Sequence, residues 1–438
     1  MSGSAASPEA LQGRAAVVLF LSFAFAYFFS ALLRAVTATL APVFSAELGL
    51  AAGQLGLLAG AYFLGFAAMQ LPLGAALDRW GARQVLTGFL LAAVLGCLAF
   101  ATAAGLRQML LARLLIGAGV SACLMAPLTC FRHRLSTGAQ LRANSWMLMT
   151  GSLGMLASTL PVQWLLPLVG WRGLFLGVAA LLVVAVALVR RVVPVDGPAA
   201  GGARAIGPAQ PAAGASSGLA RGAAAGYSSV FRHSAFIRVA PLGFVVYGGL
   251  IAMQSLWVGP WLTEVAGRQA SGAAQGLFVV NLAMLLAFLC WGAVMPRLIR
   301  AGWAGERLIA VAWPAGVLCL AWIVWRGAEA GPALWALWCV CTSVVSLSQP
   351  AVAQAFPAAL AGRALSAYNL VIFAGVFSVQ WGIGLAIDAL RAAGLAPVAA
   401  YRVAFLVFLL ACALSFLWLN LLRWRAGRAG CTSAVLQA

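Results

Sequence analysis

The sequence predicts an all-α membrane protein with twelve transmembrane helices arranged as two pseudo-symmetric halves of six. Three observations support this fold class. Apolar residues make up 64% of the chain and charged residues only 8%, which is far from the composition of a soluble domain. Apolar runs of about twenty residues, long enough to cross a bilayer core, recur along the whole chain. Short sequence patterns of the first half also return in the second half.

Each apolar run gives one expected helix. A bilayer core offers backbone groups no hydrogen-bond partners, and the runs lack the two-residue alternation of barrel strands, so helices are the expected elements. In the first half they span 15–44, 52–73, 84–104, 108–130, 142–166 and 172–193. In the second half they span 237–263, 275–296, 307–326, 332–356, 364–388 and 398–422.

A segment rich in Ala, Gly, Pro and Ser separates the two sets of runs. This composition is typical of a flexible linker. The expected organisation is therefore an N-terminal tail, a six-helix bundle, a linker, a second six-helix bundle and a C-terminal tail, at 1–14, 15–193, 194–236, 237–422 and 423–438.

The two halves share local patterns at equivalent helices. The sixth run opens with "WRGLFL" at Trp171 and the twelfth with "YRVAFL" at Tyr401, so both read aromatic-Arg-x-x-Phe-Leu. The fifth and eleventh runs both contain "VQW", around Gln163 and Gln380. Together these matches indicate duplication of a six-span unit.

The formal net charge of +19 comes from arginines, and their distribution along the chain explains it. If the N-terminus is cytoplasmic, nineteen arginines fall on the inner side and six on the outer side. This asymmetry follows the positive-inside rule and predicts a bacterial-type inner membrane protein with both termini in the cytoplasm. The charge is therefore expected to contact anionic membrane lipids, and no nucleic-acid partner is expected.

One loop carries a specific motif. Between the second and third runs stands "GAALDRWGAR", Gly74 to Arg83, which fits G-x-x-x-D-R-x-G-x-R. This loop resembles the signature loop of the major facilitator superfamily (MFS) of transporters. The resemblance implies transport without enzymatic activity, and a cytoplasmic gating loop that contains Gly74, Asp78, Arg79, Gly81 and Arg83. Both glycines are expected to permit a tight turn.

Other parts of the chain match the superfamily less evenly. The second half has "GAVMPRLIRAG", with Pro296 where an aspartate would stand, so the second copy of the loop is degraded. The fourth run, "RLLIGAGVSA" from Arg113, is similar to the pattern of that helix in the family. The fifth run lacks the G-P-x-x-G-G element associated with drug/proton antiporters, which counts against drug efflux.

Arg34 is the most informative residue, because it lies inside the first apolar run. An arginine at the centre of a membrane helix costs about 2.5 to 3.5 kcal/mol on insertion scales, so it should face a polar cavity or a partner. Helical spacing puts small or polar residues, including Tyr27, on the side of Arg34 and bulky ones on another. Arg34 is therefore expected to point into the protein, in a helix that lines the central cavity of superfamily members.

Arg113 is the second arginine expected inside the membrane. All eight acids fall in loops or at helix ends: Glu9, Glu47, Asp78, Asp196, Glu264, Glu306, Glu329 and Asp388. Two intramembrane cations without an intramembrane acid favour an anionic substrate, since a carboxylate can accept a bidentate guanidinium contact. An arginine seven residues after an aromatic in the first helix also resembles the organic-anion transporters of the superfamily.

A structural role for both arginines stays open. Arg34 can bond helix-end carbonyls or Glu47, and Arg113 can pack as a structural residue of its helix. The run 237–263 offers Tyr247 and Gln254 but no arginine in its membrane part, which favours a monocarboxylate over a phosphate ester. The candidate substrate-binding residues are Arg34, Tyr27, Arg113, Gln254, Gln349, Gln163 and Gln380, although interhelical hydrogen bonding explains any one of the glutamines equally well.

The sequence thus predicts a secondary active or facilitative transporter, a symporter or uniporter, of a small carboxylate-type anion by alternating access. The partners expected are this solute and membrane lipids, and the functional state expected is a monomer. A proton is the candidate coupling ion, but the membrane spans hold no acid or histidine in their middle to carry it, so uniport, exchange and coupling through a helix-end acid such as Asp388 or Glu47 stay open. Cofactors and metals are not expected, because no CxxC pair or metal-ligand cluster occurs. Efflux of amphipathic, drug-like compounds and a non-transporting membrane sensor are the alternatives.

Overall fold

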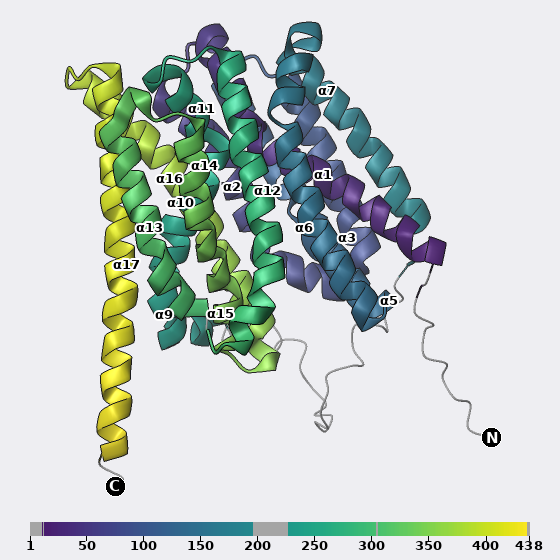
Figure 1. Cartoon of the computed structure of the whole chain (residues 1–438). Helices are drawn as coiled ribbons and strands as arrows, with labels where there is room; N and C mark the ends of the chain where they lie inside the picture. Colours follow the sequence, from purple (N-terminus) through teal and green to yellow (C-terminus); the bar gives the residue numbers. More distant parts are fainter. Residues whose placement is uncertain (1–10, 12, 196–226, 304, 436–438) are drawn as a thin grey trace. The chain divides into compact units, whose positions relative to one another are not determined.

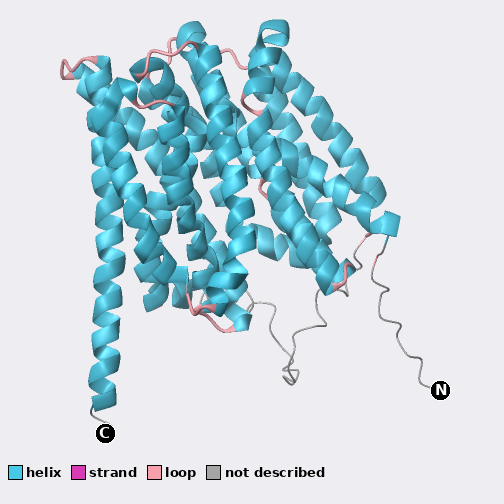
Figure 2. Cartoon of the chain, in the orientation of Figure 1, coloured by secondary structure: helices cyan, strands magenta, loops and turns pink. Residues whose placement is uncertain are grey.

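The computed structural model describes residue 11 and residues 13–195, 227–303 and 305–435. These parts of the chain consist of helices and the loops that join them, without a strand (Figure 2). The helices are labelled in Figure 1. Those of the first half of the chain are α1 (Gly13–Leu48), α2 (Ala52–Ala68), α3 (Gln70–Ala101), α4 (Leu106–Val120), α5 (Ala122–Arg134), α6 (Thr137–Ala157) and α7 (Leu160–Val192).

The helices of the second half include stretches with other helical hydrogen-bond patterns. The first is α9 (Ser234–Pro241), which continues through η1 (Leu242–Tyr247), α10 (Gly248–Ala252), η2 (Met253–Trp257), α11 (Val258–Pro260) and η3 (Trp261–Val265). Then follow α12 (Ala270–Arg300), α13 (Gly305–Arg326), η4 (Gly327–Glu329), α14 (Pro332–Thr342), η5 (Ser343–Leu347), α15 (Ser348–Gln354), α16 (Ala358–Ala392) and α17 (Pro397–Val435).

The twelve-helix prediction agrees with the structure once two glycine turns are taken into account. Ten helical stretches in the described parts are long and apolar enough to cross a membrane. The other two spans begin with α2, an apolar helix of 17 residues before α3, and with α6, a helix of 21 residues before α7. Gly81 has a φ of 74° inside α3 and Gly170 a φ of 64° inside α7. The chain turns at each of these glycines. The part of α3 before Gly81 therefore completes the second span and the part after it forms the third, and α7 is divided in the same way at Gly170 between the fifth and sixth spans.

Several predicted boundaries are therefore wrong. The spans predicted to end at 73 and 166 continue to the turns at Gly81 and Gly170, because only glycine adopts a positive φ without strain. The span 108–130 is interrupted at Ser121, between α4 and α5. The last span continues as one helix to Val435, well past the predicted end at 422 (Figure 1).

The predicted linker 194–236 lies mostly outside the described residues. Residues 196–226 lie outside the described residues, whereas 227–232 are helical and α9 begins at Ser234. The last part of the predicted linker 194–236 is therefore already helical. His233 lies between these two helical stretches and its Nδ1 accepts a hydrogen bond from the N–H of Ala235 at 3.3 Å, which caps α9.

Contacts divide the chain into two compact units. Unit one comprises Met1–Val36 and Leu64–Gly207, and unit two comprises Thr37–Phe63 and Pro208–Ala438. The sequence-based bundles, 15–193 and 237–422, assign the first two helices wholly to the first half. In the structure, the end of α1 and the first part of α2 pack with the helices of the second half, so both helices pass from one unit to the other.

Each unit has an aromatic core built on the repeated pattern of its last helix. In unit one, the ring centroid of Phe100 lies 5.6 Å from that of Trp171 and 4.2 Å from that of Phe175. In unit two, Phe405 packs against Trp261 and Trp335 with centroids 4.8 and 5.7 Å apart. Phe175 and Phe405 are the equivalent residues of "WRGLFL" and "YRVAFL", so the repeat has a packing role.

The repeated arginine has a structural role in unit two. Arg402 donates from Nε to the carbonyl of Val324 at 3.0 Å and from Nη2 to that of Trp325 at 3.1 Å. These carbonyls belong to the last turn of α13, where backbone acceptors lack helical partners and a cation is favourable. In unit one, the guanidinium of Arg172 lies 4.1 Å from the ring centroid of Trp171.

Candidate substrate-contacting residues

Arg34 lies in the middle of α1, in unit one, and is half-buried. Its guanidinium carbon is 5.8 Å from the ring centroid of Phe66. Its neighbours on either side along α1, Leu33 and Ala35, are 1% and 2% exposed. The side chain is therefore partly buried within unit one, with an aromatic ring beside it.

Arg113, on α4, is almost completely buried, with 1% of its surface exposed. Its Nη1 donates to the backbone carbonyl of Leu33 at 2.9 Å. Leu33 directly precedes Arg34, so Arg113 joins α4 to α1 at the level of the other intramembrane arginine. This geometry favours a positioning role for Arg113 over direct contact with a solute.

Tyr27 is held against α6 at a close helix crossing. A Cβ added at Gly151 would lie 2.6 Å from Cε1 of Tyr27, and one at Gly154 would meet the carbonyl oxygen of Phe28. Tyr27 is 6% exposed. Because α6 approaches so closely, little of the Tyr27 surface is left for another partner in this structure.

Gln163 and Gln254, two further residues predicted from the sequence, lie in different units. Gln163 is half-buried near the start of α7, in unit one. Gln254 is 6% exposed on η2, in unit two. No single site within one unit unites them.

Unit two contains a polar cluster of three side chains on three helices. Gln349, on α15, donates from Nε2 to Oδ1 of Asn369 on α16 at 2.7 Å. Tyr247, at the end of η1, donates from its hydroxyl to Oε1 of Gln349 at 3.5 Å. Tyr247 and Gln349 are half-buried. The cluster can exchange hydrogen bonds with a neutral or anionic group, but it holds no charge of its own.

Of the three cluster residues, the sequence analysis named Gln349 as a candidate and noted Tyr247 in its span, but it did not name Asn369. Asn369 is 7% exposed and is followed by a run of mostly apolar residues in α16. Burying an asparagine at the start of such a run costs free energy unless its side chain has a hydrogen-bond partner. Its position at the start of the run could therefore have marked Asn369 as a polar contact. Its partner, twenty residues away, could not be identified from helical spacing because it belongs to another helix.

Gln380 is engaged in contacts between helices. It is 0% exposed, and its Nε2 donates to Oγ of Ser255 at 2.8 Å. Its backbone carbonyl accepts a hydrogen bond from Nε1 of Trp257 at 3.2 Å. These bonds fit the reading of Gln380 as an interhelical contact.

The two glycines of the gating loop differ in backbone conformation. Gly81 has the positive φ of the turn, whereas Gly74 lies in the helix with nothing within 4 Å of an added Cβ. The expectation that both glycines are needed for the turn is therefore wrong for Gly74. Asp78 and Arg79 are exposed, and the guanidinium of Arg79 lies 5.3 Å from the ring centroid of Trp80. Arg83 is half-buried just after the turn.

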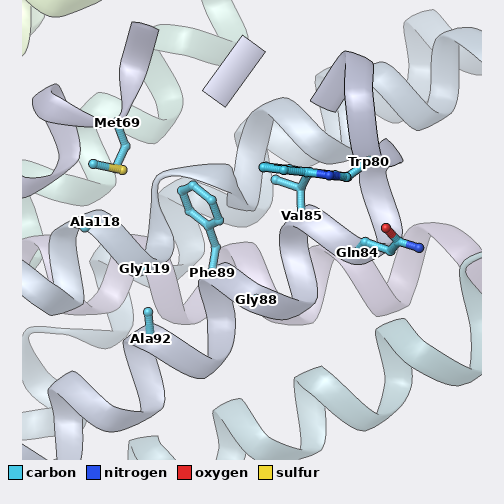
Figure 3. Close-up of a pocket in the computed structure, with 9 residues that line it drawn as sticks. All are labelled: Met69, Trp80, Gln84, Val85, Gly88, Phe89, Ala92, Ala118 and Gly119. Atoms are coloured by element: carbon cyan, nitrogen blue, oxygen red, sulfur yellow. The ribbon is translucent and has the colours of Figure 1, made fainter. Parts of the chain in front are cut away.

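An apolar cavity of about 560 Å³ lies beside the gating loop, within unit one (Figure 3). Trp80 and Gln84 belong to α3 on either side of the Gly81 turn, and Phe89, also on α3, is one of the side chains drawn in Figure 3. The lining residues do not include any predicted substrate-binding residue: they are Met69, Trp80, Gln84, Val85, Gly88, Phe89, Ala92, Ala118 and Gly119. Such a lining suits an apolar group better than an anion.

The described residues contain no group of three or more His, Cys, Asp or Glu that could hold a metal ion. Two of the acids in this part of the chain form ion pairs. Arg238 bonds Glu306 at 2.8 Å and Arg326 bonds Glu329 at 3.0 Å. These acids are thus engaged in contacts between or within helices of unit two.

Comparison with known proteins gives a family match and several structural relatives. The sequence model described as Major Facilitator Superfamily matches residues 23–378. No curated protein sequence matches. A solved structure of a bacterial homolog of the human lysosomal transporter Spinster, described as inward-facing and unoccupied, is 16% identical with a TM-score of 0.67, and the match covers 94% of this chain and 98% of that one.

Two further structures give the same result. A D-xylose–proton symporter is 13% identical with a TM-score of 0.68, over 92% of this chain and 96% of that one. The nucleoside transporter NupG is 14% identical with a TM-score of 0.70, over 92% and 99%. At these identities the likeness shows the fold.

Proposed function

The chain belongs to the Major Facilitator Superfamily and is a multi-pass membrane transporter, and from this premise we propose that it carries a small organic anion of the carboxylate type. The observation that supports this substrate class is Arg34, a half-buried guanidinium in the middle of a transmembrane helix. A guanidinium that is only partly desolvated can donate two hydrogen bonds to a carboxylate in a bidentate contact. Transport by alternating access follows the family assignment.

Within unit two, the polar cluster Tyr247–Gln349–Asn369 is a separate candidate for solute contact. Its three side chains offer hydrogen-bond donors and acceptors but no positive charge. A single proposed guanidinium contact at Arg34 favours a solute with one carboxylate over a doubly charged phosphate ester. Gln163 in unit one and Gln254 in unit two are further candidates for polar contacts with a solute.

A thermal-shift measurement on the purified protein in detergent tests the substrate class. Small carboxylates, other anions, cations and neutral solutes are compared with the parent and with Arg34→Gln. One carboxylate class is expected to stabilise the parent, by about 2.7 kcal/mol when the ligand is at 100 times its Kd. Arg34→Gln is expected to lose this stabilisation.

The control variant is Arg107→Gln, which removes an exposed arginine at the start of α4. It should keep the anion effect. Equal stabilisation of the parent and a folded Arg34→Gln by carboxylates would contradict the proposed role of Arg34.

A second candidate function is efflux of amphipathic compounds. The apolar cavity of about 560 Å³ beside the gating loop favours it, because its lining would accommodate a hydrophobic group. Stabilisation by neutral or cationic amphiphiles, equal in the parent and in Arg34→Gln, would support this candidate instead. A flux assay separates either transporter from a sensor built on the same fold.

Energy coupling and placement complete the proposal. One structural relative is a proton symporter, so a proton is the coupling ion that we propose. The arginine distribution supports a bacterial inner membrane with both termini in the cytoplasm, and a monomer is the proposed functional state.

A further inference from the structure

The start of α2 is capped by a side chain from a distant helix. Asp388, near the end of α16, accepts a hydrogen bond from the N–H of Ala52 at 3.1 Å through Oδ1. It accepts another from the N–H of Gly53 at 2.8 Å through Oδ2. One carboxylate therefore bonds two successive amides of a helix that begins 336 residues earlier in the chain.

The sequence explains why α2 needs this partner. The first amides of a helix have no intrahelical acceptor, and Ser, Thr, Asp or Asn at the preceding position usually supplies one. The residues before Ala52 are Gly49, Leu50 and Ala51, none of which has a side-chain acceptor. Gln54 accepts from the N–H of Ala51 at 3.0 Å, which leaves the next two amides to Asp388.

The backbones of α2 and α16 also approach very closely. A Cβ added at Gly53 would lie 2.7 Å from Oδ2 of Asp388, and one at Gly60 would lie 2.9 Å from Cδ2 of Phe377. Between these two positions, an added Cβ at Gly56 would meet the backbone oxygen of Gln380. The two helices can therefore touch only because these positions on α2 are glycines.

The same contact is tight when viewed from α16. A Cβ at Gly384 would meet the backbone oxygen of Ala52. Gln380, one turn earlier, is held by Ser255 and Trp257 as described above. The α16 surface is thus fixed within unit two, and the carboxylate of Asp388 adds charge-assisted bonds and a favourable interaction with the α2 dipole.

The capped helix is not confined to one unit. Residues 52–63 of α2 belong to unit two and residues 64–68 to unit one. Both partners of the α2–α16 contact, the first turn of α2 and Asp388, lie in unit two, and α2 continues from there into unit one. The gating loop follows the same span at its other end, where α3 reaches the Gly81 turn.

We propose that Asp388 is a gating residue of the transporter. Its carboxylate holds the first turn of α2 against α16, and this contact opens when solute enters from the membrane side on which α2 begins. The proposal rests on the proposed function as a transporter but does not depend on the substrate class. Neither the arginine sites nor the gating loop Gly74–Arg83 includes this residue.

The test measures access to the start of α2. Ala52 is 6% exposed, so Ala52→Cys places a shielded thiol beside the contact between Asp388 and the first turn of α2. Whole cells are treated with a membrane-impermeant maleimide, and protein with only its native cysteines is the blank. Asp388→Asn keeps the shape of the side chain but removes its charge and one acceptor, and it is expected to raise the labelling rate at least fivefold.

Hydrogen exchange gives a second readout without an introduced cysteine. In purified Asp388→Asn, the peptide containing Ala52 and Gly53 is expected to exchange at least tenfold faster than in the parent. Glu264→Gln is the matched control, because Glu264 is exposed and lies, like Asp388, within electrostatic reach of Tyr401. It should change neither readout, whereas Asp388→Glu should restore most of the protection.

Unchanged labelling and exchange in a folded Asp388→Asn protein would overturn the proposal. If this variant does not fold, Asp388→Ser, which keeps one acceptor at the helix start, is measured in its place. Failure of both to fold would also overturn it, because a gate must open in a folded protein. If carboxylates do not stabilise the parent protein but Asp388→Asn still shows faster labelling and exchange, only the proposed substrate class is contradicted.

Discussion

At the level of single residues, the two intramembrane arginines have different surroundings. Arg34 is half-buried beside Phe66, whereas Arg113 is 1% exposed and bonds the carbonyl that precedes Arg34. From the sequence both were candidate substrate contacts, and a structural role stayed open for each. Helical spacing predicted the inward direction of Arg34, but the difference in burial depends on how α4 packs on α1, which spacing within one helix does not specify.

This difference leads to a prediction for Arg113→Gln. Because Arg113 acts on α1 through the carbonyl of Leu33, its loss should loosen the position of Arg34 without removing a ligand charge. The apparent Kd for the stabilising carboxylate is expected to rise about tenfold, equivalent to about 1.4 kcal/mol, and saturating ligand should still stabilise the protein. The measurement is a thermal-shift titration beside Arg34→Gln.

A result in which Arg113→Gln abolishes the anion effect as completely as Arg34→Gln would instead make Arg113 a direct ligand contact. Arg113→Lys offers a further comparison, because it keeps the charge but cannot reproduce the geometry of the guanidinium. A positioning role predicts partial recovery in this variant.

At the level of helices, the sequence predicted the existence of the spans well and their ends poorly. The apolar runs were visible because lipid-facing helices need them, while the ends depend on a few backbone angles. Charged residues in 74–83 suggested a loop, yet the helical hydrogen bonding continues to Gly81. The three π-helical stretches between Leu242 and Val265 left no signal in the apolar pattern.

The turn between the second and third spans gives an element-level prediction. Gly81→Ala is expected to lower the free energy of unfolding by about 1 kcal/mol or more, because alanine is strained at a φ of 74°. Gly74→Ala should be neutral or slightly stabilising, since Gly74 is helical and has open space around it. Thermal midpoints of the two single variants, measured in the same detergent, provide the comparison.

Equal midpoints for both variants would show that the turn relaxes to a backbone that tolerates a side chain. A lower thermal midpoint in Gly74→Ala alone would mean that the stability of the loop depends on Gly74, the glycine that lies within the helix. The same pair also separates folding from gating, because only a functional role for Gly74 changes transport without changing the midpoint.

At the level of the whole molecule, the superfamily fold was predictable because a twelve-span pattern and a loop motif are properties of the chain itself. The candidate site was less predictable. Arg34 and Gln349 were found from their polarity within apolar runs, whereas Asn369 and Asp388 act through partners on other helices. The grouping of residues 37–63 with the second half also depends on packing and not on sequence order.

The arginine distribution makes a prediction about orientation in the membrane. A green fluorescent protein fused after Ala438 should fluoresce in a bacterial host, because it folds in the cytoplasm and the positive-inside rule places the C-terminus there. A fusion truncated after Gly267, one span later than the linker, should be dark. Bright emission from the truncated fusion together with a dark full-length fusion would reverse the predicted topology.

The buried tryptophans of unit two also have a spectroscopic consequence. Trp257, Trp261, Trp313, Trp335 and Trp338 are all fully buried, and Trp261 and Trp335 lie with their ring centroids 5.5 Å apart. Indoles shielded from water emit at shorter wavelengths, and indoles this close share their excitation. The protein thus contains an intrinsic fluorophore concentrated in one of its two units, with Trp257 bonded to the helix that carries Asp388. Its emission would follow movements of that helix in the unlabelled protein, in real time.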